Sequence, residues 1–414
     1  MLDPGARMQI LIVSTRFPFP PRWGFATRVY QLARQLAKHH DVTLLSGADG
    51  IEEDQVEALR AELPVVVVRR GQRASKRARQ VTALVGRGSF HAREFLSDEL
   101  QDAVDTLASE SRFDVVQIES SLLGGIRFPS EPRLVLDEHN IEYEVFQRMQ
   151  VGERSLARRA FYGREHARFR PFEQQLWRRV DGCVVTSARE QDIVGRHAPA
   201  TPCAVVPNGV DVDYFRPWAA EVNPDTLVFN GVLDYRPNLD AALFLVDEVL
   251  PRVRATVPTA RLTVVGRGAA ADLAHLRRNP GVCVTGEVPD VRPYLAGSSV
   301  VVVPIRIGGG TRLKVVEGLA MSRPMVTTTL GCEGIDVVDE RQLLIRDDAD
   351  SFAAAVVSLL ADPDRGSALG AAGRDLIETR YSWASAAGRL EELYGALVSG
   401  APAREVALAA GGRA

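Results

Sequence analysis

The chain has 414 residues, of which 46% are hydrophobic and 25% charged, as in an ordinary globular protein. This length exceeds what one hydrophobic core usually serves, so two domains are expected. The formal net charge of −3 and the isoelectric point near 6.2 argue against a dedicated nucleic-acid binder, which is usually strongly basic, and no nucleic-acid partner is expected.

The cysteines and the apolar runs indicate the cellular compartment. The cysteines are far apart and form no Cys-x-x-Cys pair, so we expect buried free thiols rather than disulfides or a zinc site: Cys183, Cys203, Cys283 and Cys332. No apolar run is long enough for a membrane-spanning helix, and the first such run ends in SxRFPFPP rather than in a small-residue cleavage site. The expected location is cytoplasmic.

Short β-branched runs recur along the chain, and most are followed by a stretch with helical periodicity. They lie at residues 10–14, 42–46, 65–68, 115–119, 134–137 and 183–187 in the first half, and at 204–207, 227–230, 261–266, 282–285, 300–304 and 325–328 in the second. Apolar runs without alternation are typical of parallel strands covered on both faces. Because one open sheet rarely holds about twelve strands, the sequence predicts an α/β fold with two Rossmann-like, doubly wound parallel sheets.

The division between the two domains is expected where prolines interrupt the pattern, between His197 and Pro202. The predicted domains are residues 8–198 and 199–380. A C-terminal helix over residues 381–398 is expected to return to the first domain, and residues 399–414 are expected to form a frayed tail.

Residues 69–93 form a basic run with no acidic residue. Its members are Arg69, Arg70, Arg73, Lys76, Arg77, Arg79, Arg87 and Arg93. One interpretation is a solvated helix face, and the other is a surface that contacts anionic lipid head groups or an anionic acceptor. The second interpretation predicts a peripheral position on the inner face of a membrane.

A glycine-rich turn joins the strand predicted at 300–304 to the next helix, and it contains Gly308, Gly309, Gly310 and Thr311. Glycines let the backbone approach a ligand closely, and the free N–H groups of a helix start favour a phosphate. Arg312 and Lys314 place positive charge in the first helical turn, where it opposes the helix dipole unless an anion binds. A tight turn with basic surface residues is the alternative, but this conflict favours a phosphate site.

Two elements of the first half occupy the same kind of position. Gly24 lies between the first predicted strand and the helix that begins near Thr27, and His139 directly follows the strand predicted at 134–137. Doubly wound sheets bind their ligands at the carboxyl ends of the strands. Both residues are therefore predicted to belong to a functional site.

Four segments carry a family resemblance, which covers roughly residues 8 to 398. These are Val205-Val-Pro-Asn-Gly-Val-Asp211, Val284-Thr-Gly-Glu-Val-Pro-Asp290, the block from Gly310 to Val326, and Tyr381-Ser-Trp383. They resemble glycosyltransferase family four. The resemblance implies a GT-B fold, in which two Rossmann-like domains face a cleft. It also implies a retaining transfer from a nucleotide diphosphate-sugar donor to an acceptor, without an obligatory metal or other cofactor.

The same resemblance implies roles for individual residues. Glu317 would hold the donor ribose, and Gly24 would let the backbone approach the donor phosphates or sugar. His139 would contact the donor sugar near the reacting centre, and the backbone of Glu287 and Val288 would meet the base. Independently of the resemblance, the proximity of Arg312 and Lys314 to the glycine-rich turn leads us to expect that they act on the leaving diphosphate, in place of a metal held by an Asp-x-Asp motif.

The sequence departs from the family pattern at three positions. A glutamate usual in the family is replaced by Gly309, and an arginine and a lysine are replaced by Val232 and Asn238. We expect Arg236, Arg312 and Lys314 to supply the missing positive charge, and the amides of 308–310 to contact the sugar. A non-catalytic GT-B subunit that binds a sugar or a partner and a GT-B nucleotide-sugar epimerase are the alternatives. The base, the sugar and the acceptor (glycan, lipid-linked or secondary-metabolite) stay open.

Overall fold

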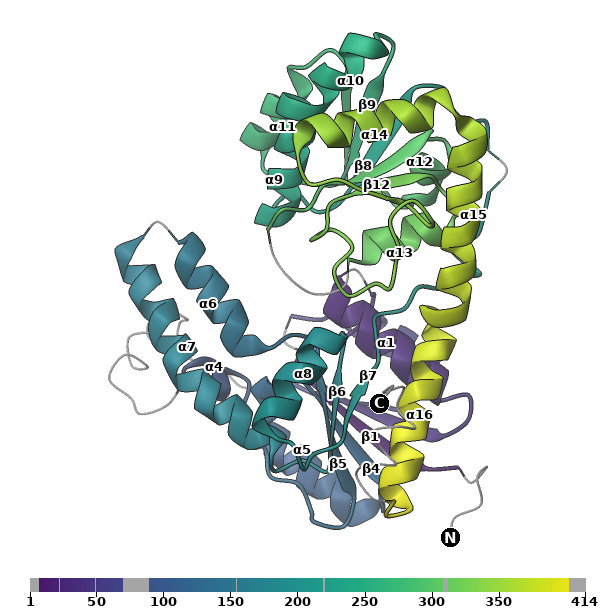
Figure 1. Cartoon of the computed structure of the whole chain (residues 1–414). Helices are drawn as coiled ribbons and strands as arrows, with labels where there is room; N and C mark the ends of the chain where they lie inside the picture. Colours follow the sequence, from purple (N-terminus) through teal and green to yellow (C-terminus); the bar gives the residue numbers. More distant parts are fainter. Residues whose placement is uncertain are drawn as a thin grey trace. The chain divides into compact units, whose positions relative to one another are not determined.

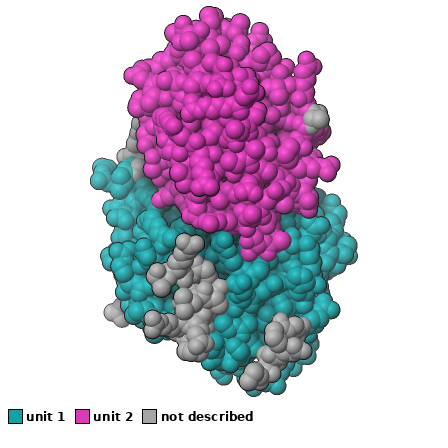
Figure 2. All heavy atoms as spheres, turned by 45° about the vertical axis from the view of Figure 1, so that its right-hand side comes forward, with its two compact units in different colours: residues 1–207, 386–414 teal, residues 208–385 magenta. Residues whose placement is uncertain are grey.

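The computed structural model describes residues 7–21, 23–48, 50–69, 89–153, 155–218, 220–307 and 312–401. The chain divides into two compact units (Figure 2), one of residues 1–207 with 386–414 and the other of residues 208–385. Among the described residues, no helix combines the length and the apolar character that crossing a membrane requires.

The first unit is built on a parallel sheet of seven strands in the order β3-β2-β1-β4-β5-β6-β7. The strands are β1 (Gln9–Ser14), β2 (Asp41–Gly47), β3 (Val65–Val68), β4 (Val115–Glu119), β5 (Arg133–Glu138), β6 (Gly182–Val185) and β7 (Cys203–Val205). The central strands are buried almost throughout, because helices cover both faces of the sheet. The strand order reverses between β1 and β4, which is where doubly wound sheets place their ligands.

Along the sequence, the helices of the first unit alternate with these strands (Figure 1). They are α1 (Gly24–Leu36), α2 (Glu53–Arg60), α4 (His91–Glu94), α5 (Asp98–Glu110), the short 3₁₀-helix η1 (Ser121–Leu123), α6 (Glu142–Gly152), α7 (Leu156–Trp177) and α8 (Ala188–His197). Helix α16 (Trp383–Val398) belongs to this unit from Ala386 onwards. Its Tyr394 hydroxyl donates a hydrogen bond to Gln117 of β4, which ties the end of the chain to the sheet.

The second unit contains a parallel sheet of six strands in the order β10-β9-β8-β11-β12-β13. The strands are β8 (Thr226–Asn230), β9 (Arg261–Val265), β10 (Val282–Gly286), β11 (Val300–Val303), β12 (Met325–Thr327) and β13 (Leu344–Ile345). The helices are α9 (Arg236–Phe244), the π-helix η2 (Leu245–Val249), α10 (Leu250–Thr256), α11 (Ala270–Arg277), α12 (Arg292–Ala296), α13 (Leu313–Ala320), α14 (Ala349–Ala361) and α15 (Pro363–Arg380). Val300–Val303 is fully buried at the centre of this core.

The structure differs from the sequence predictions in two places. The strand expected at 204–207, as the first of the second domain, is β7 at Cys203–Val205, and it pairs with β6 in the first sheet. The boundary between the two units therefore falls in the sequence between Pro207 and Asn208. The prolines near residue 200 belong to a turn between a helix and a strand inside the first unit. The expectation of buried free thiols holds for three cysteines, but Cys283 is exposed on β10, an edge strand. The tail beyond residue 401 lies outside the described residues.

Candidate functional site

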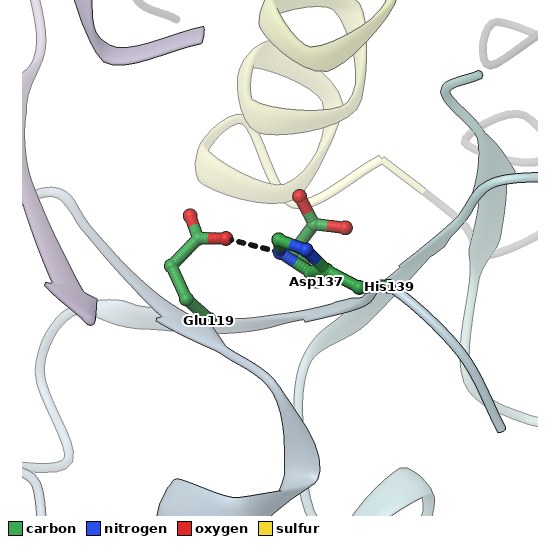
Figure 3. A group of neighbouring side chains, drawn as sticks. All are labelled: Glu119, Asp137 and His139. Carbon is green, nitrogen blue, oxygen red and sulfur yellow. Dashed lines mark hydrogen bonds and ion pairs between the residues drawn. The ribbon is translucent and has the colours of Figure 1, made fainter. Parts of the chain in front are cut away.

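The carboxyl edge of the first sheet brings together residues that are distant in sequence (Figure 3). The Nε2 atom of His139, which follows β5, lies 2.7 Å from Oε2 of Glu119 at the end of β4. Glu119 is fully buried, and its other oxygen accepts a hydrogen bond of 2.6 Å from Nε2 of Gln117. The hydrogen bond between His139 and buried Glu119 fixes the orientation of the His139 ring.

Helix α1 begins directly against this histidine. The Phe25 ring stacks on the His139 ring, with 4.7 Å between the centroids and 30° between the planes. Gly24 is the first residue of the helix, whose first turn contains no acidic residue, and Trp23 at the cap position makes no side-chain cap. Free N–H groups and the helix dipole at such an end attract an anion. The structure thus places the predicted residues Gly24 and His139 at one site.

A buried ion pair between Arg28 and Asp137 lies beside the histidine, and it bears on whether a metal ion could bind at this site. The donor atoms of Glu119, Asp137 and His139 all lie within 4.8 Å of one another, which is close enough for a shared cation. Both oxygens of Asp137 already accept hydrogen bonds of 2.9 Å from the guanidinium of Arg28 in α1. Both oxygens of Glu119 are also engaged, so the donor set fits a hydrogen-bonded cluster better than a metal site.

Three more carboxylates lie behind this edge and hold the start of α6. Glu173 of α7 accepts hydrogen bonds from Oγ of Ser121, at 2.8 Å, and from the backbone N–H of Glu142, at 2.9 Å. Glu138 accepts one of 2.8 Å from the indole of Trp177. Burial raises the pKa of Glu173 to about 8 and that of Glu142 to about 7, and it raises the pKa of Glu138 well above its usual range. The loop that carries His139 is therefore anchored by buried, hydrogen-bonded carboxyl groups.

The second unit has its own cluster, at the carboxyl end of β8. The ammonium of Lys314, in the first turn of α13, donates a hydrogen bond of 2.6 Å to Oδ1 of Asn238 and lies 4.6 Å from the centre of the Phe229 ring. Glu317, one turn later, accepts a hydrogen bond of 3.4 Å from Nδ2 of Asn230. Lys314 and Glu317 therefore lie on the same side of α13, and both reach the end of β8.

The protonation of this cluster is shifted by its surroundings. Burial lowers the pKa of Lys314 to about 7; nearby Glu317 opposes this shift, and Arg312 adds to it. Burial also raises the pKa of Glu317, against the effect of Lys314. A cation that is only half charged near neutral pH is suited to an anionic ligand, since the ligand restores the charge when it binds.

One glycine makes room for the ammonium group, and a second lets the backbone approach that glycine closely. A Cβ atom on Gly231 would lie 2.7 Å from Nζ of Lys314 and 2.9 Å from the amide of Asn238. Gly266 has a φ of 152°, and its Cβ would lie 1.9 Å from the carbonyl oxygen of Gly231. Asn238 occupies the position where the family usually has a lysine. In this chain the Asn238 side chain instead accepts a hydrogen bond from a lysine of α13.

The remaining predicted residues have different surroundings. Arg312 is the cap residue of α13, and exposed Arg236 is the first residue of α9, two positions before Asn238. Glu287 and Val288 follow β10, with Glu287 exposed and Val288 packed against the core. The glycine-rich turn at 308–311 lies outside the described residues, so its predicted contacts stay predictions.

Sequence reasoning missed several members of both clusters. In the first unit these are Phe25, Arg28 and Glu119, and in the second they are Phe229 and Asn230. Glu119 and Asn230 end predicted strands, as His139 nearly does. This position at the end of a predicted strand was the sequence signal that could have identified Glu119 and Asn230.

Comparison with known proteins gives consistent matches for both units. The family model "Glycosyltransferase Family 4" matches residues 24–214, and "Glycosyl transferases group 1" matches residues 224–362, so together they span most of the chain. A GDP-mannose-dependent monoacylated alpha-(1-6)-phosphatidylinositol monomannoside mannosyltransferase of Corynebacterium glutamicum is 30% identical over 43% of this chain. That alignment covers 52% of the relative, about half of its length. A GDP-mannose-dependent alpha-(1-6)-phosphatidylinositol monomannoside mannosyltransferase of Mycobacterium tuberculosis is 27% identical over 70% of this chain and 86% of the relative.

Solved structures show the fold. Sucrose-phosphate synthase from Thermosynechococcus elongatus superposes with a TM-score of 0.70 at 19% identity, over 95% of this chain and 100% of that one. Anabaena HepE in complex with UDP superposes with a TM-score of 0.66 at 12% identity, over 94% of this chain and 100% of that one. The architecture is that of the GT-B proteins, as the sequence predicts.

Proposed function

This chain belongs to the family 4, group 1 glycosyltransferases, and on that premise we propose that it transfers a mannosyl residue from GDP-mannose to a lipid-linked acceptor. The mannosyltransferase relatives support the choice of donor and acceptor, because their names specify GDP-mannose and a phosphatidylinositol mannoside. The cluster at the end of β8 supports the use of a nucleotide diphosphate-sugar.

The observation that carries the proposal is the placement of Lys314 and Glu317 on one side of α13. Breaking the anomeric bond leaves a nucleoside diphosphate, and its developing charge needs a preorganised cation. Lys314 is held for this role by Asn238 and Phe229. Glu317 is suited to accept hydrogen bonds from ribose hydroxyls.

We extend the proposal to the course of the reaction. The family resemblance implies retention of the anomeric configuration, with His139 close to the donor sugar. Arg312 and Lys314 would replace a metal at the diphosphate. We therefore expect turnover to survive EDTA, whereas complete loss with chelator, restored by manganese or magnesium, would contradict metal independence. The anomeric configuration of the first product, observed by proton NMR, tests retention.

A peripheral membrane position on the cytoplasmic side is also part of the proposal. The basic run 69–93 supports it by its charge, and a lipid-linked acceptor requires access to a membrane surface. Of this run only residues 69 and 89–93 lie in the described part of the chain.

The test begins with donor binding in buffer without lipid. GDP-mannose should raise the melting temperature more than UDP-glucose or dTDP-glucose at equal concentration. The protein should also slowly hydrolyse GDP-mannose, and Lys314→Ala should lower kcat because leaving-group charge develops only in the transition state. Binding without any turnover would favour the non-catalytic subunit, and conversion of the donor sugar into its epimer would favour the epimerase.

A further inference from the structure

Helices α6 and α7 form an antiparallel hairpin that projects from the sheet of the first unit (Figure 1). The part of the hairpin near the sheet is firmly packed, since Phe146 and Phe169 meet at 5.5 Å between ring centroids. Further out, a Cβ atom on Gly163 would lie 2.6 Å from the side chain of Gln150, so the glycine allows the two helices to approach closely. The packing of the two helices therefore holds the outer end of the hairpin in a defined position.

That outer end, residues 148–159, is here called the hairpin tip. Val151 and Leu156 are each 80% exposed and Met149 is 41% exposed, although all three are large apolar side chains. They lie where α6 ends and α7 begins. Isolated exposed apolar residues are common, but a group on one projecting end indicates a contact surface.

The sequence of the hairpin tip is also rich in positive charge. It contains four arginines and one glutamate, of which Arg154 lies outside the described residues: Arg148, Arg154, Arg158, Arg159 and Glu153. Arg158 lies 3.7 Å from Glu153, and Arg148 forms an ion pair of 3.1 Å with Glu144. Arg159 is exposed and makes no ion pair within the described residues. An excess of positive charge next to exposed apolar groups is complementary to anionic phospholipid head groups over acyl chains.

The basic run 69–93 ends against the same helix. The backbone N–H groups of Phe90 and His91 donate hydrogen bonds of 3.0 and 3.1 Å to the carboxylate of Glu165 in α7, and Oγ of Ser89 donates another. Burial raises the pKa of Glu165, but hydrogen bonds from the His91 ring, from Ser89 and from the two backbone N–H groups outweigh it and lower the pKa to about 2. The carboxylate therefore stays ionised and keeps this anchor at physiological pH. The hairpin and the end of the basic run thus form one connected structure.

From these observations we propose that the hairpin tip docks on the anionic surface of a phospholipid membrane. Met149, Val151 and Leu156 enter the boundary between head groups and acyl chains, and the arginines contact lipid phosphates with their stems along the apolar surface. A protein partner fits less well, because three apolar side chains on a convex end bury far less than the roughly 800 Å² per partner of a stable interface. A membrane contact can be small, because anionic head groups attract each basic side chain that comes near the surface.

The experiment is vesicle co-sedimentation of the full chain, with vesicles of phosphatidylcholine alone or mixed with phosphatidylglycerol. We expect binding only to the mixed vesicles and a decrease at high salt. Val151→Asp/Leu156→Asp should lower the bound fraction about fivefold or more, and so should Arg158→Glu/Arg159→Glu. The matched controls are Val338→Asp, at an exposed valine of the second unit, and Arg112→Glu/Arg196→Glu, at exposed arginines of the first, and these should bind like the unmodified protein.

A reporter variant locates the contact directly. Leu156→Trp should show a blue shift of its fluorescence when mixed vesicles are added, with the unmodified protein as the background. The proposal is overturned if the protein ignores anionic vesicles, if the tip variants bind as well as the controls, or if the reporter shows no shift while the protein sediments. Circular dichroism and GDP-mannose binding in vesicle-free buffer show that each variant is folded. They also separate a failure of docking from a failure of the proposed function.

Discussion

Protonation of Lys314 should couple donor binding to pH. Its pKa lies at about 7 instead of the usual 10.5, so at pH 8 only about a tenth of the free protein carries the charge, and at pH 6 about nine-tenths does. A diphosphate next to the ammonium group favours the charged form and raises this pKa. Binding at pH 8 should therefore take up close to one proton, and binding at pH 6 only about a tenth of one.

The sign of the effect on affinity follows from the same equilibrium. Below pH 7 the lysine is already charged and donor affinity is complete, whereas above pH 7 each binding event must first protonate it. From pH 6 to pH 8 the affinity for GDP-mannose should fall about tenfold. The diphosphate of a nucleotide sugar is esterified at both ends, so its own charge does not change over this range.

Isothermal titration calorimetry tests this prediction. Titrations at pH 6 and pH 8, each in two buffers with different ionisation enthalpies, give the number of protons taken up. Lys314→Arg is the matched control, because a guanidinium stays charged and Glu317 remains in place. If the unmodified protein takes up no proton at pH 8, or if the arginine variant takes up as many, the assignment of Lys314 to the diphosphate is wrong.

Three further predictions concern single residues. Glu317→Ala should raise the KM for the donor about tenfold with a smaller change in kcat, as measured by initial rates, because it removes hydrogen bonds to the ribose. Arg28→Met should lower the free energy of unfolding in urea by about 3–5 kcal/mol, because it leaves Asp137 buried without its partner, and equal stability would show that the pair contributes nothing. Gly266→Ala should lower the melting temperature strongly because its Cβ atom would lie only 1.9 Å from a carbonyl oxygen, whereas Gly195→Ala, in open space on α8, should leave it equal or higher.

The sequence alone was sufficient for the architecture and for part of the site. Uninterrupted apolar runs report strands that are covered on both faces, and the alternation of strands with helices implies parallel sheets. Residues that directly follow strands of a parallel sheet lie at its carboxyl edge by topology alone. Lys314 and Glu317 are three residues apart, which is the spacing of neighbours on one side of a helix, and the structure places them so.

Pairings between distant elements were decided only by the tertiary structure. The spacing of apolar residues indicates how an element is buried, but it does not indicate which strand lies beside it. For this reason β7 was assigned to the wrong sheet. Glu119 reaches His139 because β4 and β5 are neighbours in register. Lys314 meets Asn238 because α13 and the start of α9 converge across 76 residues of sequence. The charge state of that lysine depends on the burial this convergence creates, which is why no local pattern in the sequence revealed it.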